Sequence, residues 1–235
     1  MPVPTIGGPG CRIGIEEFET FVATQLGQLD LTGKRLCIII PDDTRSCPMP
    51  RILRAVHKAI AGRAASTVCV IALGTHEYLT ARQIASWAAG DPDADPAEVY
   101  PGMPIVNHRW KDPGQLVGIG TIPAERIAEL SEGRLARAAE VLINKTVVEA
   151  DVKLVVGPIL PHEVVGISGG NKYFVPGCAA HELIDITHWV GALITSAKMI
   201  GSPGSTPVRA MIDEGASLIP GEKYCLAFVI KAHSA

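Results

Sequence analysis

The chain has 235 residues, of which 47% are hydrophobic, and it carries a formal net charge of −3 at pH 7. This length and apolar content suffice for a substantial core, in one large domain or two small ones. The weak negative charge and singly scattered arginines argue against nucleic-acid binding, which requires a basic surface.

Three further features of the sequence indicate the compartment in which the protein works. The six cysteines are widely spaced and form no CxxC pair, so we expect reduced thiols and no disulfide framework. The longest apolar segment, residues 183–200, includes an aspartate, a histidine and a lysine, which makes it a poor membrane span. The N-terminus lacks the basic and apolar stretches of a signal peptide. We therefore expect a soluble, cytoplasmic protein.

The first half of the chain alternates strands with helices. Residues 34–43 (KRLCIIIPDD) contain a β-branched apolar run ended by Pro41, which predicts a buried strand. Residues 48–65 then place apolar side chains at helical spacing. A second strand is predicted over residues 67–76 (TVCVIALGTH), and a helix over residues 80–90 follows it.

The second half of the chain is harder to divide. Residues 91–120 are rich in Pro, Gly and Asp, which predicts a long surface excursion with short strands near 104–110 and 114–120. A third buried strand is predicted over residues 148–162. The last predicted elements are a helix over 181–201 that ends at Gly201, a helix over 206–219 and a strand over 223–232.

This order of elements predicts an α/β fold with a parallel-type sheet, flanking helices and a site formed by the strand-end loops. We treat residues 1–235 as one catalytic domain, whose boundary between subdomains the sequence leaves unclear. Polar side chains follow each of the three apolar strands, and in a parallel sheet they would converge at one edge. These side chains are Asp42, Thr44, Arg45, His76, His162 and Lys172.

Each of these residues also has a structural interpretation. Asp42 or Asp43 could cap the next helix while Arg45 pairs with one of them on the surface. His76 and His162 could be solvated loop residues, and Lys172 a solvated ammonium group. Gly169 and Gly170 could simply build a turn. All of these interpretations would have to hold at once for three strand ends to lack function.

Two familiar motifs almost match this chain and fail. HELIDITH lacks the second histidine that the zinc-protease pattern HExxH requires, because Asp185 occupies that position. GISGGNKY departs from a P-loop at Asn171, and Tyr173 replaces the Ser or Thr that would bind magnesium. The glycines before Lys172 could still hold one phosphate through backbone amides.

The remaining histidines differ in their prospects. His57 and His108 are most simply explained as packed or surface residues. His181 and His188 are two helical turns apart, so both could face the same direction, and a ligand role is open to either.

With these motifs in hand, the chain resembles the N-terminal catalytic domain of the nickel-dependent lactate racemase family, from about Lys34 to Ile219. The resemblance rests on D-x-T-R at 42–45, G-T-H at 74–76, P-H-x-x-x-G-x-S-G-G-x-K at 161–172, and the histidine at 188. The residues after G-T-H, Glu77 to Leu79, depart from the family's basic and proline residues, which leaves the substrate open.

The resemblance implies a racemase or epimerase of a 2-hydroxy acid that uses nickel and a pyridinium-3,5-bisthiocarboxylic acid mononucleotide, the nickel-pincer nucleotide. It implies that Lys172 holds this cofactor covalently and that His188 is the protein ligand of nickel. Asp42, Thr44, Gly169 and Gly170 would help to hold the cofactor's sugar or phosphate. His76 and His162 would be the acid/base pair, and Arg45 would bind the substrate carboxylate.

The residue types suit this chemistry. Histidine accepts and returns a hydroxyl proton near neutral pH, arginine grips a carboxylate with two parallel hydrogen bonds, and imidazole is a natural nickel ligand. The family's C-terminal domain, which closes over the site, is expected to be missing from this chain. Two alternatives therefore remain: a cofactor-binding module that is inactive without that domain, or another enzyme acting on a phosphate ligand or using another metal.

Overall fold

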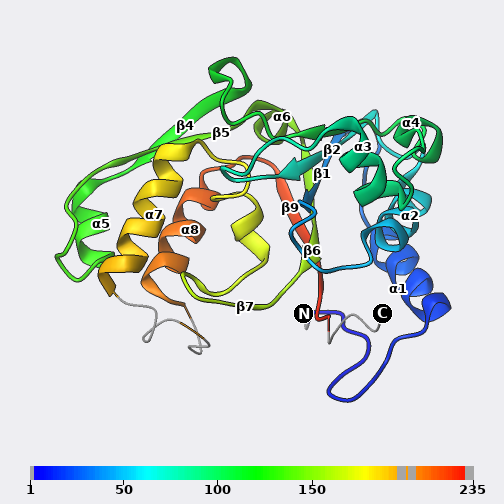
Figure 1. Ribbon diagram of the computed structural model, residues 1–235, viewed down its shortest axis with the longest axis horizontal. Coiled ribbons are helices and arrows are strands. Elements are labelled where there is room, and N and C mark those ends of the chain that lie inside the picture. The colour runs from blue at the N-terminus through cyan, green and yellow to red at the C-terminus, as the bar shows by residue number, and fades with distance from the viewer. Residues whose placement is uncertain (1–2, 195–199, 201–204, 231–235) are drawn as a thin grey trace.

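A computed structural model describes residues 3–194, 200 and 205–230. Its centre is a five-stranded parallel sheet in the order β3-β2-β1-β6-β9 (Figure 1). The strand bounds are β1 Arg35–Pro41, β2 Ser66–Ala72, β3 Ile105–Asn107, β6 Val152–Pro158 and β9 Glu222–Phe228. The predicted α/β fold with a parallel sheet and flanking helices is therefore confirmed.

The central strands are continuous apolar runs because both faces of the sheet are covered. Alternate residues of β1 enter different cores: Ile39 belongs to one cluster, and Ile38 and Ile40 to the other. The helices α7 and α8 cover the first face and α1 and α2 the second, on the left and right of the sheet in Figure 1. Buried side chains thus fix the sheet between two helical layers.

Eight α-helices lie within the described residues. Their bounds are α1 Ile15–Gly27, α2 Met49–Ile60, α3 Ala81–Ile84, α4 Pro96–Val99, α5 Ala124–Leu130, α6 Lys145–Glu149, α7 His181–Ile194 and α8 Pro207–Ser217. A single π-helical segment, η1 (Ala85–Ala89), continues α3. The predicted end of the 181–201 helix at Gly201 lies outside the described residues, as do the last positions of the predicted 223–232 strand.

The middle of the chain differs most from its prediction. An antiparallel pair, β4 (Leu116–Ile122) with β5 (Ala139–Asn144), forms a separate small sheet, and the sequence analysis assigns nothing to β5. The two short strands predicted near 104–110 and 114–120 are present as β3 and β4. The surface position predicted for residues 91–120 is partly wrong, because β3 joins the main sheet and Tyr100 and Met103 are buried in the core. The prolines and glycines of this segment correctly predicted its turns, but they gave no sign that Tyr100 and Met103 would be buried.

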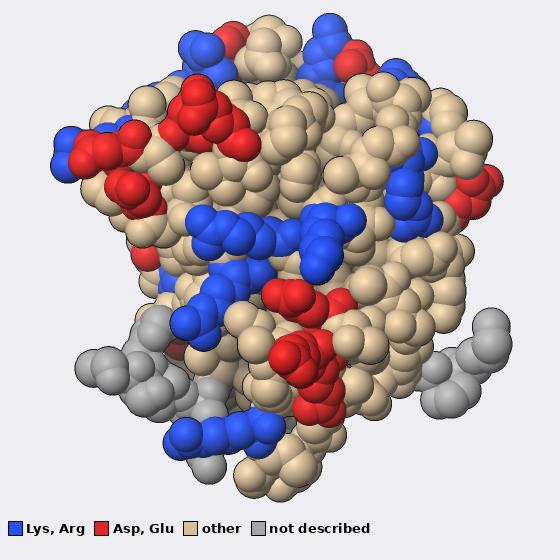
Figure 2. Space-filling view, turned by 90° about the vertical axis from the view of Figure 1, so that its right-hand side faces the viewer, with Lys and Arg blue, Asp and Glu red and all other residues tan. Residues whose placement is uncertain are grey.

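The surface and the thiols agree with the composition. Figure 2 shows the face that carries α1 and α2, where basic and acidic groups both appear among uncharged residues and neither sign dominates. All six cysteines are free thiols. Of the helices formed by the described residues, none is sufficiently long and apolar to cross a membrane.

Candidate active site

The sheet order brings three predicted strand-end loops side by side. Strand β1 is central and pairs in parallel with β2 on one side and with β6 on the other. The loop with Asp42 and Arg45 follows β1, the turn with His76 follows β2, and His162 follows β6. Because the three strands are parallel, these residues all leave the same edge of the sheet.

Asp42 joins the first loop to the second. Its carboxylate is 4% exposed, and one oxygen accepts a hydrogen bond from Nδ1 of His76. The other oxygen accepts a hydrogen bond of 2.6 Å from the Thr44 hydroxyl. Both carboxylate oxygens of Asp42 are thus engaged by the protein itself, whereas the His76 ring is 53% exposed.

The turn that carries His76 is held from two sides. Gly74 has a φ of +57° and its amide donates to the carbonyl of Gly177, 2.9 Å away. The indole Nε1 of Trp110 donates to the His76 carbonyl at 2.9 Å. These contacts fix the backbone of the turn while leaving the imidazole at the surface of the loop.

His162 lies in a small hairpin formed by β7 (Pro161–His162) and β8 (Gly166–Ile167). Its side chain is only 13% exposed, and Nδ1 accepts a hydrogen bond of 3.1 Å from the backbone amide of Val164. Burial lowers the pKa of His162 to about 4, assisted by the positive charges of Lys172, Arg45 and His188 and opposed by Glu163. The imidazole is therefore neutral at pH 7.

Lys172 follows a tight glycine turn. Gly169 has a φ of +97°, and a Cβ there would lie 2.9 Å from Ile159, so only glycine fits without strain. Burial lowers the pKa of Lys172 to about 8, with further lowering by the charges of Arg45 and Arg209. About a tenth of this amine is therefore unprotonated at pH 7, far more than in an ordinary lysine, and the unprotonated form is the nucleophile.

Helix α8 fastens the glycine turn. Nη1 of Arg209 donates to the carbonyl of Gly169 at 2.9 Å and, more weakly, to that of Ile167 at 3.4 Å. One turn later, Asp213 accepts a hydrogen bond of 2.9 Å from the Asn171 amide. Two side chains of one helix therefore hold the backbone and the side chain of the turn before Lys172.

Arg45 lies in the loop after β1 and is half-buried. The ion pairs among the described residues include none with Arg45, and its charge contributes to the lowered pKa of both His162 and Lys172. The alternative in which Asp42 or Asp43 caps the next helix is wrong, because the N-cap of α2 is Pro48. The proposed surface pairing of Arg45 with these aspartates is likewise absent from the described ion pairs.

His188 is an exposed residue on α7. Its Nδ1–H donates to the carbonyl of Ile184 at 2.8 Å, which directs the unprotonated Nε2 of the neutral ring away from the helix. This is the orientation that metal-binding histidines usually have. Within the described part of the chain, no three His, Cys, Asp or Glu residues gather as a metal site.

The remaining histidines contact residues outside the three strand-end loops. His57 bonds the Pro101 carbonyl and packs edge-on against Tyr100. His108 is fully buried, where Nε2–H donates to the Ala179 carbonyl and Nδ1 accepts from Asn144. Both are structural. His181 lies near Trp110, with ring centroids 6.4 Å apart.

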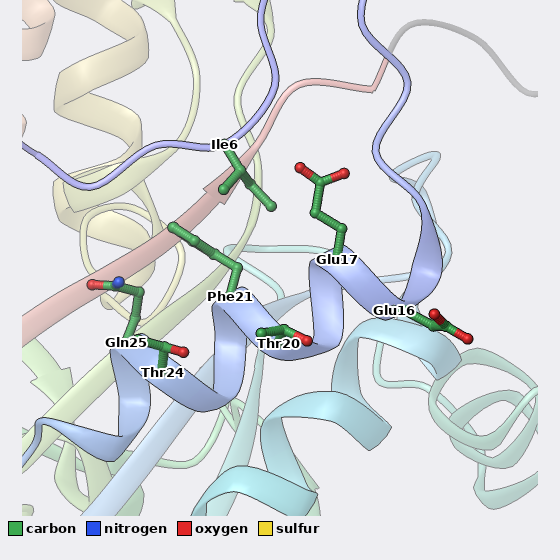
Figure 3. A pocket seen from close by; sticks show the side chains of 7 residues that line it. All are labelled: Ile6, Glu16, Glu17, Thr20, Phe21, Thr24 and Gln25. Atoms are coloured by element: carbon green, nitrogen blue, oxygen red, sulfur yellow. The ribbon is translucent and has the colours of Figure 1, made fainter.

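Sequence reasoning missed Arg209, Asp213 and Trp110, which support the loops from helices and turns far away in the chain. The only sequence signal for the first two is their i, i+4 spacing on one helix face. A separate hollow lies along α1, between Ile6 and Phe21, and it shares no lining residue with the strand-end loops (Figure 3).

Residues 20–201 match the family described as lactate racemase N-terminal domain. Two lactate racemases are similar in sequence. The one from Thermoanaerobacterium thermosaccharolyticum is 30% identical over 159 residues, covering 66% of this chain and 32% of that protein. The one from Lactiplantibacillus plantarum is 29% identical over 171 residues, covering 71% of this chain and 35% of that protein.

Two solved structures share the fold. A Thermotoga maritima protein superimposes with a TM-score of 0.82 at 23% identity, covering 94% of this chain and 52% of that one. The apoprotein of the T. thermosaccharolyticum lactate racemase gives a TM-score of 0.76 at 22% identity, with 94% and 50% coverage. The chain thus spans about half of each solved structure and about a third of each curated relative. Because the family model matches most of its length, the chain belongs to the lactate racemase N-terminal domain family.

Proposed function

We propose that the protein is a racemase or epimerase of a 2-hydroxy acid that works with a nickel-pincer nucleotide. The observation that carries the proposal is the position of His76, Arg45 and His162 after three adjacent parallel strands, with Lys172 and His188 within electrostatic reach of His162. Membership of the lactate racemase N-terminal domain family supports the same chemistry.

Arg45 is proposed to bind the substrate carboxylate. Its guanidinium is half-buried and is not used in an ion pair among the described residues, so its planar pair of donors is available. A carboxylate held there would neutralise a positive charge that now acts on both His162 and Lys172. This gives a 2-hydroxy acid one fixed end, with its hydroxyl free to meet a histidine.

The two histidines are proposed to handle the hydroxyl proton. When the carbon that bears the hydroxyl is inverted, the hydroxyl proton must leave and then return on the opposite side of that carbon. An acid/base group is therefore needed on each side of the carbon. His76 offers an exposed ring supported by Asp42, and His162 offers a neutral ring in a more buried position. Their different surroundings suit complementary parts in one exchange.

The residues around Lys172 and His188 fit the proposed cofactor. The Lys172 amine, with its pKa near 8, would form the covalent bond, and Nε2 of His188 would bind nickel whose other ligands come from the cofactor. Thr44 and the turn at Gly169 and Gly170 would lie against its sugar or phosphate. When bound, the cofactor supplies a hydride acceptor at the carbon that is inverted.

A second candidate follows from the length of the match. Because the chain spans about half of the solved relatives, it could bind the cofactor without turning over substrate until another domain covers the site. The two candidates share the cofactor-binding residues and differ in whether this chain alone supplies a closed, water-free site for hydride transfer.

The test is to express the chain with nickel and the enzymes that build the cofactor. We expect an intact-mass adduct that is lost in Lys172→Ala and kept in Lys58→Ala, a control on the exposed surface of α2. Chiral chromatography of D- and L-2-hydroxy acids then measures racemisation. An adduct without racemisation favours the binding module, whereas the absence of any adduct and of nickel refutes both candidates.

A further inference from the structure

We propose that the two histidines hold opposite tautomers in the resting protein, and that Asp42 is a positioning residue that makes His76 the proton acceptor. The consequence for catalysis rests on the proposed function, but the tautomers themselves do not. Asp42 was expected to contact the cofactor, and its surroundings in the fold support this different role.

The His76 tautomer follows from the partner of its Nδ1. The Asp42 carboxylate is an acceptor only, so the shared hydrogen must sit on Nδ1 of His76. The neutral ring then presents an unprotonated Nε2. Thr44 donates to the second oxygen of Asp42, which restricts the rotation of the carboxylate. Because the carboxylate is 4% exposed, a ligand has little access to it.

The His162 tautomer follows from the opposite kind of partner. The backbone amide of Val164 can only donate, so Nδ1 of His162 must be unprotonated to accept its hydrogen bond of 3.1 Å. The proton of the neutral ring is therefore on Nε2. A hydrogen on Nδ1 would clash with the hydrogen of that amide. The Glu163 carboxylate, 3.6 Å from Nδ1, would accept a hydrogen bond from Nδ1–H only if the bond to Val164 were broken.

Because the two tautomers differ, only His76 can accept a proton at Nε2 in the resting protein. A substrate hydroxyl facing His76 can pass its proton directly to Nε2, which yields an imidazolium whose Nδ1–H still donates its hydrogen bond to Asp42. A hydroxyl facing His162 instead meets an N–H donor, and that ring must first move its own proton. The resting protein is therefore prepared for proton removal on the His76 side and for hydrogen-bond donation on the His162 side.

The tautomers can be measured without the cofactor. The full chain is labelled with ¹⁵N-histidine, and long-range ¹H–¹⁵N spectra are recorded at about pH 8, where an ordinary imidazole with a pKa near 6.5 is neutral. His76→Gln and His162→Gln assign the two rings. We expect an Nδ1–H pattern for His76 and an Nε2–H pattern for His162. The same tautomer in both rings would overturn the proposal.

Substitution of Asp42 tests its part in this arrangement. In Asp42→Asn, Thr44 can keep the amide oxygen, so the amide nitrogen faces His76 and donates to Nδ1, which forces the ring into the Nε2–H tautomer. Asp43→Asn, on the exposed neighbour, should leave the spectrum unchanged. A His76 pattern that persists in both Asp42→Asn and Asp42→Ala would show that Asp42 does not set the tautomer.

The cofactor-loaded protein separates this inference from the proposed function. We expect Asp42→Asn to keep the adduct on Lys172 and the KM while lowering kcat by about 100-fold or more, the usual contribution of a positioned base. Racemisation in a protein whose histidines share one tautomer would refute the inference alone. Opposite tautomers in a loaded protein that never racemises would refute the racemase proposal alone.

Discussion

At the scale of single residues, Lys172 makes the sharpest prediction. Its pKa of about 8, lowered chiefly by burial, means that its amine reacts well below the pH at which an exposed lysine does. In competitive acetylation read by mass spectrometry, Lys172 should reach half its maximal reactivity near pH 8, about two pH units below an ordinary lysine. Lys58, on the exposed surface of α2, is followed in the same experiment as the reference. Equal midpoints for the two lysines would contradict the buried environment of Lys172.

The lowered pKa of Lys172 also determines how the free energy of unfolding changes with pH. The unfolded chain binds a proton at Lys172 up to the ordinary lysine pKa, whereas half of the folded molecules have released it at about pH 8. The folded state thus binds fewer protons across this window, and stability attributable to Lys172 rises with pH through it. Urea titrations of the wild type and Lys172→Met should diverge in this direction.

Arg45 makes a third prediction at the residue scale. Arg45→Lys keeps the positive charge that acts on His162 and Lys172 but loses the two parallel donors. We expect the KM for the 2-hydroxy acid to rise about tenfold or more in the loaded enzyme, with the Lys172 adduct retained. An unchanged KM would mean that Arg45 stabilises its loop and does not bind substrate.

The sequence reveals which residues end the strands, but not their partners. Asp42, His76, His162 and Lys172 were identifiable because polar residues after apolar strands are conspicuous. The contact between Asp42 and His76 was not, because it joins residues 34 positions apart and depends on β1 lying beside β2. The amide that sets His162 was equally hidden, since every residue except proline offers a backbone amide.

At the scale of elements, predictability follows burial. β1, β2 and β6 were predicted because their continuous apolar runs end in turn residues, as buried parallel strands do. The short, mixed sequence of β5 (AEVLIN) lacks that contrast, and no element was assigned to α1, α5 or α6. β3, three residues long, becomes a sheet member only through its pairing with β2.

Helix α8 makes the prediction at this scale. Arg209→Gln should loosen the glycine turn and remove a positive charge near Lys172, and both effects raise the pKa of Lys172 above 8. Competitive acetylation should then show a higher midpoint. Arg209→Lys keeps the charge without the forked donor and should move the midpoint less. Arg126→Gln, which removes a partner of Glu214 on the same helix, serves as the control, and an equal shift there would mean that α8 stability alone is responsible.

At the scale of the whole molecule, a buried lysine stabilises the edge of the sheet where the strands begin, opposite the candidate site. Lys153 on β6 is fully buried, and its ammonium group donates to the carbonyls of Ala150 and Pro220. Gly221 gives it room, because a Cβ there would lie 2.8 Å from the Lys153 nitrogen. A buried charge thus joins the start of β6 to the turn before β9, and burial lowers the pKa of Lys153.

Replacement of this lysine tests how the sheet is held together. Lys153→Met should fill the space but leave two carbonyls without their donor, lowering the free energy of unfolding by about 1–3 kcal/mol near pH 7. Lys223 also donates to two carbonyls, those of Ala216 and Ile219, but is an exposed residue, so in Lys223→Met water can replace the amine. Urea unfolding should therefore show a clearly larger loss for Lys153→Met. Equal losses would mean that burial adds nothing to the cost of the missing donor. A gain in stability in Lys153→Met would mean that the desolvation of the buried charge outweighs its hydrogen bonds.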